Sequence, residues 1–363
     1  MSGAEMTFDE LSTKDGKRSL AEMATAFLTP QRIRSGAILL VLIVFMVIGS
    51  FLSPHFLTAS NLLNVARQMS IVGIVGLGMT FVILTAGIDL SVGSTLGLSA
   101  VTAAWLLTSG VFWPLALLLA ISVGAAVGAI NGLGITRGGI QPFIMTLAML
   151  VIVRGFTMTV SSGQPIPLGD VSSSIAWVGS GNFLGLPVPV WILGIVFAYS
   201  SFVLRNTRFG WHVYAVGGNL EGARRSGLNT KRTLTWVYVI AGAYAGLASL
   251  INVSRITVGA PLQGAGLELD AIAVVVIGGT SLFGGVGAVG TTLIGAAILS
   301  VMDNLLNLLG VSPFSQQIVK GLIILGAVLL ERRVPVLTVA GRGAAGPRNE
   351  KERARGPRKR RMR

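Results

Sequence analysis

Long apolar stretches recur along most of this chain, and they constrain its fold more than any other feature. A helix that crosses a bilayer needs about 20 mainly apolar residues at a rise of about 1.5 Å per residue. The eighth such stretch is short and rich in glycine, so we expect it to be broken or re-entrant. The pattern predicts an all-α polytopic membrane protein with about ten transmembrane helices, at approximately residues 36–53, 70–86, 91–108, 112–130, 140–160, 187–204, 235–254, 271–284, 288–305 and 316–331.

The composition agrees with a membrane location. Hydrophobic residues make up 52% of the chain and charged residues only 12%, with a mean hydropathy of +0.76, whereas soluble domains are about 25% charged. The 48 glycines would weaken soluble helices, but small residues let membrane helices approach one another closely. The lack of cysteine and the two distant histidines, His55 and His212, exclude a disulfide framework and argue against any metal site.

The net charge of +14 is a property of particular segments. Residues 331–363 carry twelve Lys/Arg and three acidic residues. A basic segment directly after an apolar one indicates a cytoplasmic location beside anionic lipid headgroups. We therefore give nucleic-acid binding little weight.

The short connections set the predicted orientation. Residues 205–234 contain six Lys/Arg and a further connection contains Arg137, whereas residues 161–186 contain none. Because Lys/Arg excess marks the cytoplasmic side, we expect both termini in the cytoplasm. The predicted organisation is a cytoplasmic N-terminal segment at 1–35, a transmembrane domain at 36–333 and a basic, disordered cytoplasmic tail at 334–363.

A series of short motifs resembles the permease subunits of ribose-type (monosaccharide) ABC importers. The first is Thr85-Ala86-Gly87-Ile88-Asp89-Leu90-Ser91-Val92-Gly93-Ser94, and the others follow in the family order over about residues 36–333. They are Gln141-Pro142-Phe143-Ile144 with Arg154-Gly155, Thr207-Arg208-Phe209-Gly210, Tyr214-Ala215-Val216-Gly217-Gly218-Asn219, Leu269-Asp270-Ala271-Ile272-Ala273, Ile277-Gly278-Gly279-Thr280-Ser281-Leu282-Phe283-Gly284-Gly285, Asn304-Leu305-Leu306-Asn307-Leu308-Leu309-Gly310-Val311 and Lys320-Gly321.

The connection at 205–234 contains the pattern of a short helix. Asn219 is a good N-cap, Glu221 stands in the first turn and Gly227 suits the position after the end, so we expect a helix at 220–226. Glu221-Gly222-Ala223 followed by Gly227 resembles the family's coupling helix, which contacts the ATPase, although Gly222 and Trp211 depart from the usual pattern. The alternative is a solvated loop with one helical turn. The resemblance assigns coupling to Tyr214, Gly217, Gly218, Asn219, Glu221, Ala223, Arg224 and Gly227.

Polar residues within the apolar segments are costly and usually functional. Asp89 either caps the next helix, which we favour, or lines the transport path. Lys320 is expected to form an ion pair with another helix, and Asp303, Asn304 and Asn307 to line a polar seam or the end of a helix. Arg154 either snorkels to the outer face or lines a vestibule. The candidate path residues are Asp89, Ser91, Asn131, Arg154, Asp270 and Thr280.

The chain contains no phosphate-binding loop of the Gly-x-x-x-x-Gly-Lys-Ser/Thr type and no defensible catalytic constellation. This absence favours either a subunit whose energy source lies on another chain or a carrier driven by an ion gradient. The resemblance implies the first, a transport subunit without enzyme activity or a cofactor, in which a partner binds the ATP. The resemblance implies a cytoplasmic ABC ATPase, an extracytoplasmic sugar-binding protein, a homodimer or a heterodimer with a related permease, and a bacterial inner-membrane location. The cargo would be a ribose-, xylose- or galactose-like monosaccharide moved by alternating access. Rivals are a secondary sugar transporter and an ABC permease for branched-chain amino acids or nucleosides.

Overall fold

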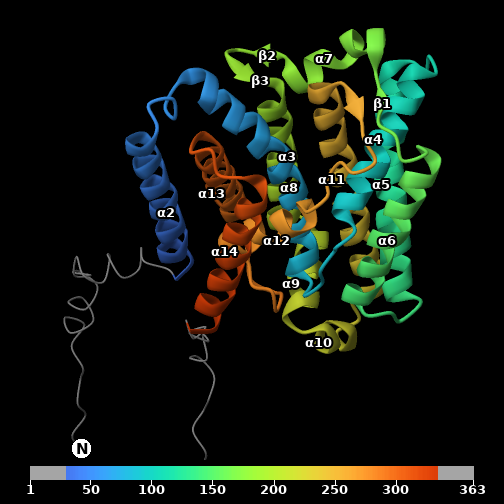
Figure 1. The fold of residues 1–363 in the computed structure, drawn as a ribbon. Helices are drawn as coiled ribbons and strands as arrows, with labels where there is room; N and C mark the ends of the chain where they lie inside the picture. The colour runs from blue at the N-terminus through green and yellow to red at the C-terminus, as the bar shows by residue number, and fades with distance from the viewer. Residues whose placement is uncertain (1–29, 334–363) are drawn as a thin grey trace, which may run out of the picture.

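The computed structural model describes residues 30–333, so the tail at 334–363 and most of the segment at 1–35 lie outside the described residues. Every predicted apolar segment falls on a helix (Figure 1). Six of them, α3, α5, α6, α8, α11 and α13, are long and apolar enough to cross a membrane. The helices on the predicted segments are α2 (Pro30–Leu52), α3 (Ala59–Leu84), α4 (Val92–Thr108), α5 (Trp113–Thr136), α6 (Pro142–Val160), α8 (Val188–Asn206), α11 (Thr230–Ile256), α12 (Leu267–Ile277), α13 (Val289–Leu308) and α14 (Pro313–Arg333).

Several boundaries differ from the prediction, and that of α3 differs most, because this helix begins at Ala59 and not near residue 70. Helix α2 begins at Pro30, inside the segment expected to precede the membrane domain, since Pro is well suited to a first helical turn. Helix α12 ends at Ile277 after only 11 residues, as expected for a broken segment. The chain then turns through glycines with positive φ, including Gly279 at +78° and Gly284 at +84°, a conformation that other residues adopt at a steric cost.

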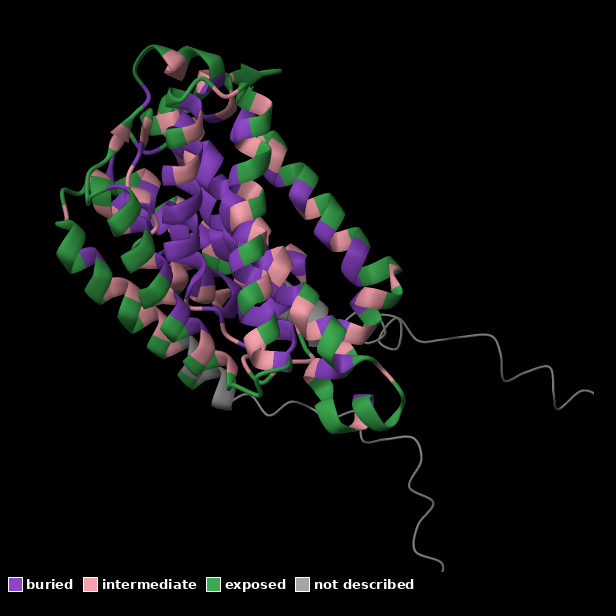
Figure 2. Ribbon diagram, turned by 90° about the vertical axis from the view of Figure 1, so that its right-hand side faces the viewer, coloured by how far each residue is buried: buried purple, intermediate pink, exposed green. Residues whose placement is uncertain are grey.

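Helix α3 forms the centre of the core. All residues from 70 to 84 are buried, which matches a helix that is apolar on every side. Side chains from α8, α11, α12 and α13 surround it, including Leu193, Val237, Val274 and Leu299. Figure 2 shows this buried interior enclosed by helices with exposed outer faces. Those exposed faces are rich in large apolar side chains, as expected for contact with lipid.

Helices α5 and α11 pack with their backbones in contact. Gly124, Gly128 and Gly132 repeat every four residues along α5, and each faces the backbone of α11. A methyl group on Gly128 would collide with the Tyr238 carbonyl oxygen, and one on Gly124 with the Gly242 carbonyl oxygen. This arrangement, which we call the glycine seam, confirms the expected role of glycine in close helix approach.

The end of the molecule opposite α9 and α10 carries structure that the sequence patterns did not predict. Two antiparallel strand pairs lie there, β1 (Ile166–Pro167) with β4 (Val258–Gly259), and β2 (Asn182–Phe183) with β3 (Leu186–Pro187). Leu184 and Gly185 both have positive φ, the backbone of a tight hairpin turn. The 3₁₀ helix η1 (Gly169–Val171) and α7 (Ser172–Ser180) complete this cap. These strands are only two residues long and pair locally within the connections, so the predicted all-α class holds for the bundle.

The other end carries two short helices, α9 (Arg208–Gly218) and α10 (Leu220–Arg225). The first turn of α2 and the last turn of α14 lie at the same end of the bundle (Figure 1). This is also the end with the clustered Lys/Arg residues of the 205–234 connection.

Candidate functional site

Helix α10 has the caps that the sequence predicts. The side chain of Asn219 accepts a hydrogen bond from the Gly222 N–H at 2.7 Å, which satisfies a free amide of the first turn. At the other end Gly227 has a φ of +80°, and the Leu228 N–H donates to the Ala223 carbonyl at 3.1 Å. This is the Schellman arrangement that stops a helix. The helix therefore ends one residue before the expected boundary, at Arg225.

Most of α10 is exposed. The Glu221 carboxylate accepts a hydrogen bond from Arg225 Nε at 3.0 Å, across one turn of the helix. Both side chains are largely exposed, so this ion pair adds little to the stability of the fold. Either residue can therefore pair with a charged group on another protein at little cost. Leu220 and Arg224 are also exposed, whereas Ala223 is buried. The helix thus presents an apolar residue and charged residues on an outer face.

Tyr214 and Gly217 hold α9 against the bundle. The Tyr214 hydroxyl donates to the Gly287 carbonyl at 2.9 Å. A methyl group on Gly217 would collide with the Leu84 carbonyl oxygen, and that carbonyl accepts from the Gly285 N–H at 2.9 Å. The end of α3, the end of α9 and the loop at 278–288 therefore meet in one place, which we call the glycine junction. Tyr214 and Gly217, both predicted coupling residues, therefore face the bundle.

Three of the predicted path residues form one buried chain of hydrogen bonds. Asn131 Nδ2 donates to Ser91 Oγ at 2.8 Å, and Ser91 Oγ donates to Asp89 Oδ1 at 2.7 Å. Asp89 also accepts from the Ser91 N–H at 2.9 Å, which forms an Asx turn just before α4; the N-cap of α4 is Ser91, and no side chain caps the helix. All three residues are at most 1% exposed. The Tyr238 hydroxyl lies against Gly87 beside this chain and has no partner among the described residues.

Arg154 points inward from α6. Its guanidinium donates to the carbonyls of Pro261 and Gln263, so it does not snorkel outward. These carbonyls and the guanidinium all face Gly97 of α4, where only a glycine leaves room for them. One turn earlier on α4, Gly93 gives the same room to the Glu268 carboxylate. The segment after β4 thus enters the bundle and places polar groups along α4.

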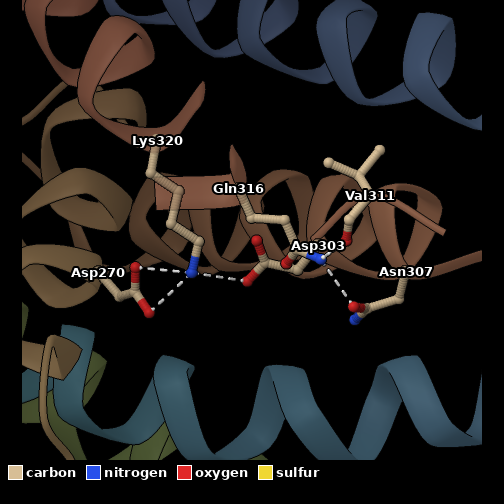
Figure 3. A network of polar contacts seen from close by, with 6 residues as sticks. All are labelled: Asp270, Asp303, Asn307, Val311, Gln316 and Lys320. Carbon is tan, nitrogen blue, oxygen red and sulfur yellow. Dashed lines mark hydrogen bonds and ion pairs between the residues drawn. The ribbon is translucent and has the colours of Figure 1, made fainter. Parts of the chain in front are cut away.

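The structure does not bring the last two predicted path residues to this place. Thr280 is buried next to Gly287 at the glycine junction. Asp270 accepts from Lys320 Nζ at 3.0 and 3.1 Å, and Lys320 also pairs with Asp303 at 3.0 Å (Figure 3). The expected interhelical ion pair of Lys320 is therefore confirmed, and its partners explain Asp270. Asp270 pairs with the ammonium group of Lys320 on α14. A carboxylate within an apolar stretch of sequence was therefore not enough to identify a residue of the transport path.

The expected polar seam on α13 is also present. Asn304 and Asn61 exchange two amide hydrogen bonds at 2.9 and 2.7 Å between α13 and α3. Gln316 of α14 donates to Asn307 Oδ1 at 2.8 Å (Figure 3). Together with Asp270, Asp303 and Lys320 these residues link α12, α13, α14 and α3, and we call them the charged seam.

Sequence reasoning missed Glu268 and Tyr238. Glu268 Oε2 is buried without a partner among the described residues, and Tyr238 is fully buried. Glu268 could have been found from the sequence, because it is an acidic residue only two positions before Asp270 in an otherwise apolar segment. Tyr238 gave none, because an aromatic residue in an apolar helix most often belongs to the core. Within residues 30–333 no group of three acidic or histidine side chains could hold a metal ion.

The described residues thus form an apolar helical bundle with buried polar groups along its interior and a capped helix at one end. Residues 61–328 match the family described as "Branched-chain amino acid transport system / permease component". The ribose import permease protein RbsC of Escherichia coli K12 is 46% identical over 297 residues, 81% of this chain and 92% of the relative. RbsC of Bacillus subtilis is 46% identical over 292 residues, which are 80% of this chain and 91% of the relative. The D-allose transport system permease protein AlsC of E. coli K12 is 37% identical over 300 residues, which are 82% of this chain and 91% of the relative. No solved structure matches.

The chain belongs to this permease family, and within it to the ribose-type ABC importer permeases. It is a multi-pass membrane protein and a subunit of a transport system. The resemblance read from the short motifs is therefore confirmed over the span that those motifs cover.

Proposed function

We propose that this permease imports a monosaccharide, a pentose or hexose similar to ribose, xylose or galactose, by alternating access. The observation that carries the proposal is the set of relatives named for ribose and D-allose, which align over about nine tenths of their own length. The family description names branched-chain amino acids, but these individual relatives favour a sugar. The protein resides in a bacterial inner membrane and receives its cargo from an extracytoplasmic binding protein.

The proposed topology has ten crossings with both termini in the cytoplasm. It is supported by the ten helices on the predicted segments and by the Lys/Arg cluster at the end of the bundle with α9 and α10. Helix α12 is too short to cross alone, so the irregular segments around it complete that passage. A reporter fused after Arg363 is expected to be cytoplasmic; an extracytoplasmic signal would contradict ten crossings.

Helix α10 is the proposed contact with a cytoplasmic ABC ATPase, which binds the ATP, so the permease needs no cofactor of its own. Its exposed Leu220, Glu221 and Arg224 offer an apolar residue and charges to a partner surface. A movement of α10 passes through α9 to the glycine junction, because Gly217 abuts the end of α3 and Tyr214 holds the 278–288 loop. This loop joins α12 to α13, so the displacement reaches the helices that flank the path.

The path is proposed to run beside α4. Asp89, Ser91 and Asn131 supply buried hydrogen-bonding groups, and Arg154 and Glu268 supply charges that meet the glycine face of α4. Hydroxyl-rich cargo needs such donors and acceptors at each state of the cycle. The permease acts as a dimer, with a second copy or a related chain. Differential contacts with the sugar in the two states would drive the change of access.

The coupling assignment is tested by reversing one charge on α10. Glu221→Lys is expected to abolish co-purification of the cognate ATPase while membrane insertion is unchanged. The matched control is Asp170→Lys, which makes the same charge change on an exposed residue of η1 at the opposite end. Normal recovery of the ATPase with Glu221→Lys would contradict the assignment.

Cargo and energy source are tested together by uptake of radiolabelled sugars in cells that carry the permease with its ATPase and binding protein. Uptake of a monosaccharide that requires the ATPase supports the proposal. Uptake that persists without any ATPase and collapses with an uncoupler would favour a secondary transporter. Uptake of a branched-chain amino acid or a nucleoside in place of sugar would favour the other class of ABC permease.

A further inference from the structure

A cavity of about 580 Å³ lies between α8, α9 and α11, away from the residues assigned to the path. This volume is within the range of about 300–1,000 Å³ that small-molecule sites occupy. Its walls are tied together at one end, where Ser200 of α8 and Tyr244 of α11 share a buried hydrogen bond of 2.8 Å. The cavity is therefore formed by the packing of the helices themselves.

The lining changes character along the cavity. At the end near α9, the wall carries Thr207, His212 and Arg232. Farther from α9, it carries Tyr199, Trp236 and Ile240. The lining thus passes from Tyr199 on α8 to Thr207, the residue that follows α8, and from Ile240 to Arg232 on α11. Such a gradient matches an amphiphile with one polar end.

The polar end of the cavity lies in a basic region. The connection at 205–234 has six Lys/Arg and a single acidic residue, Glu221, which already pairs with Arg225. Arg232 is exposed and forms no ion pair within the described part of the chain. The charge here therefore favours an anion.

The cavity opens beside a surface suited to lipid. Tyr199 is 57% exposed and Trp236 49% exposed, and Ile195 and Phe202 on the same helix as Tyr199 are exposed as well. Aromatic side chains gather at the boundary between membrane and water. Basic pockets between membrane helices on the cytoplasmic side bind anionic headgroups.

We propose that this cavity binds an anionic phospholipid of the inner leaflet, such as phosphatidylglycerol. Arg232 and the neighbouring polar side chains contact the phosphate, and an acyl chain lies along Tyr199, Trp236 and Ile240. A free phosphate ion has the same headgroup chemistry, but it would leave the apolar half of the cavity unused. None of the residues that line the cavity belongs to the proposed path or to α10.

The test uses the full-length permease purified in detergent, stripped of lipid and titrated with phosphatidylglycerol, with bound lipid counted by native mass spectrometry. One tightly bound lipid per chain is expected, with much weaker binding of phosphatidylcholine. Arg232→Gln should weaken binding about fivefold, as for one basic group at an anionic surface. Trp236→Ala should also weaken it.

The matched control is Arg225→Gln, which removes an exposed arginine of the same connection outside the cavity and should leave binding unchanged. Equal losses for Arg225→Gln and Arg232→Gln would show general charge attraction and overturn the site. Displacement of the lipid by an equal concentration of inorganic phosphate would overturn the lipid assignment in favour of a soluble anion. Retention of lipid by both cavity variants would overturn it as well.

Discussion

The glycine seam and the charged seam join helices in opposite ways. Along the first, α5 and α11 lie so close that Gly128 touches the backbone at Tyr238. Along the second, side chains connect α14 to α12 and α13, as Lys320 does by pairing with both Asp270 and Asp303 (Figure 3). In lipid no hydrophobic force favours helix association, so packing and polar bonds must provide it. This molecule uses both means in separate places.

The two seams differ in how far they can adapt. A backbone contact has no rotatable part, so α5 and α11 must move as one unit. The lysine stem has four flexible carbons, so its ion pairs persist while α14 shifts slightly against α12 and α13. The glycine seam therefore suits a fixed frame, and the charged seam suits helices that adjust during a transport cycle.

The largest effect is expected from Gly128→Leu. The added side chain collides with the Tyr238 carbonyl and the Val239 backbone, which cannot move without separating the two helices. We expect a loss of stability of about 3 kcal/mol or more, the upper part of the range for overpacking. Thermal unfolding in detergent, followed by size-exclusion chromatography, measures it. The control is Gly194→Leu on α8, where nothing lies within 4 Å; equal losses for both variants would refute the seam.

A smaller effect is expected from Lys320→Met. It leaves Asp270 and Asp303 without their shared cation, and Asp303 is only 8% exposed. Breaking a fully buried ion pair destabilises by about 3–5 kcal/mol; since these groups are partly exposed, we expect about 2 kcal/mol. The same unfolding assay applies.

Asp303→Asn sharpens this result. It leaves one carboxylate, Asp270, for the one ammonium of Lys320, so it should be clearly milder than Lys320→Met. If Asp303→Asn proved as harmful as Lys320→Met, the flexible-bridge description of the charged seam would fail.

The smallest effect is expected from Asn304→Ala. It removes the two amide hydrogen bonds with Asn61, and interhelical hydrogen bonds in membranes contribute on average about 0.6 kcal/mol each. Asn61 keeps its bond to the Phe56 carbonyl, which limits the loss to about 1 kcal/mol. Asn206→Ala, at an exposed position, is the control and should leave the unfolding temperature unchanged.

The sequence alone determined the helices of the bundle and the caps of α10. Apolar runs of bilayer length have no soluble alternative, because every backbone amide in lipid must bond within its own helix or a closed sheet. Capping is equally local, since Asn219 and Gly227 act within one or two turns of chain. The family resemblance was also readable from short motifs, all of which lie within residues 61–328 that match the family model.

Only the tertiary structure decided which polar residues share a place. Asp89 and Asp270 both stand in apolar sequence, yet the first joins Ser91 and Asn131 while the second binds Lys320. Asn131 lies 40 positions from Ser91 and Lys320 lies 50 positions from Asp270, so helix rotation and depth determine these two pairings. In the same way, the seven-residue motif Gly279–Gly285 gave no sign that its backbone would meet Leu84 and Gly217. The sequence thus established which segments form the apolar helices, and the packing of those helices decided which of their buried polar groups lie together.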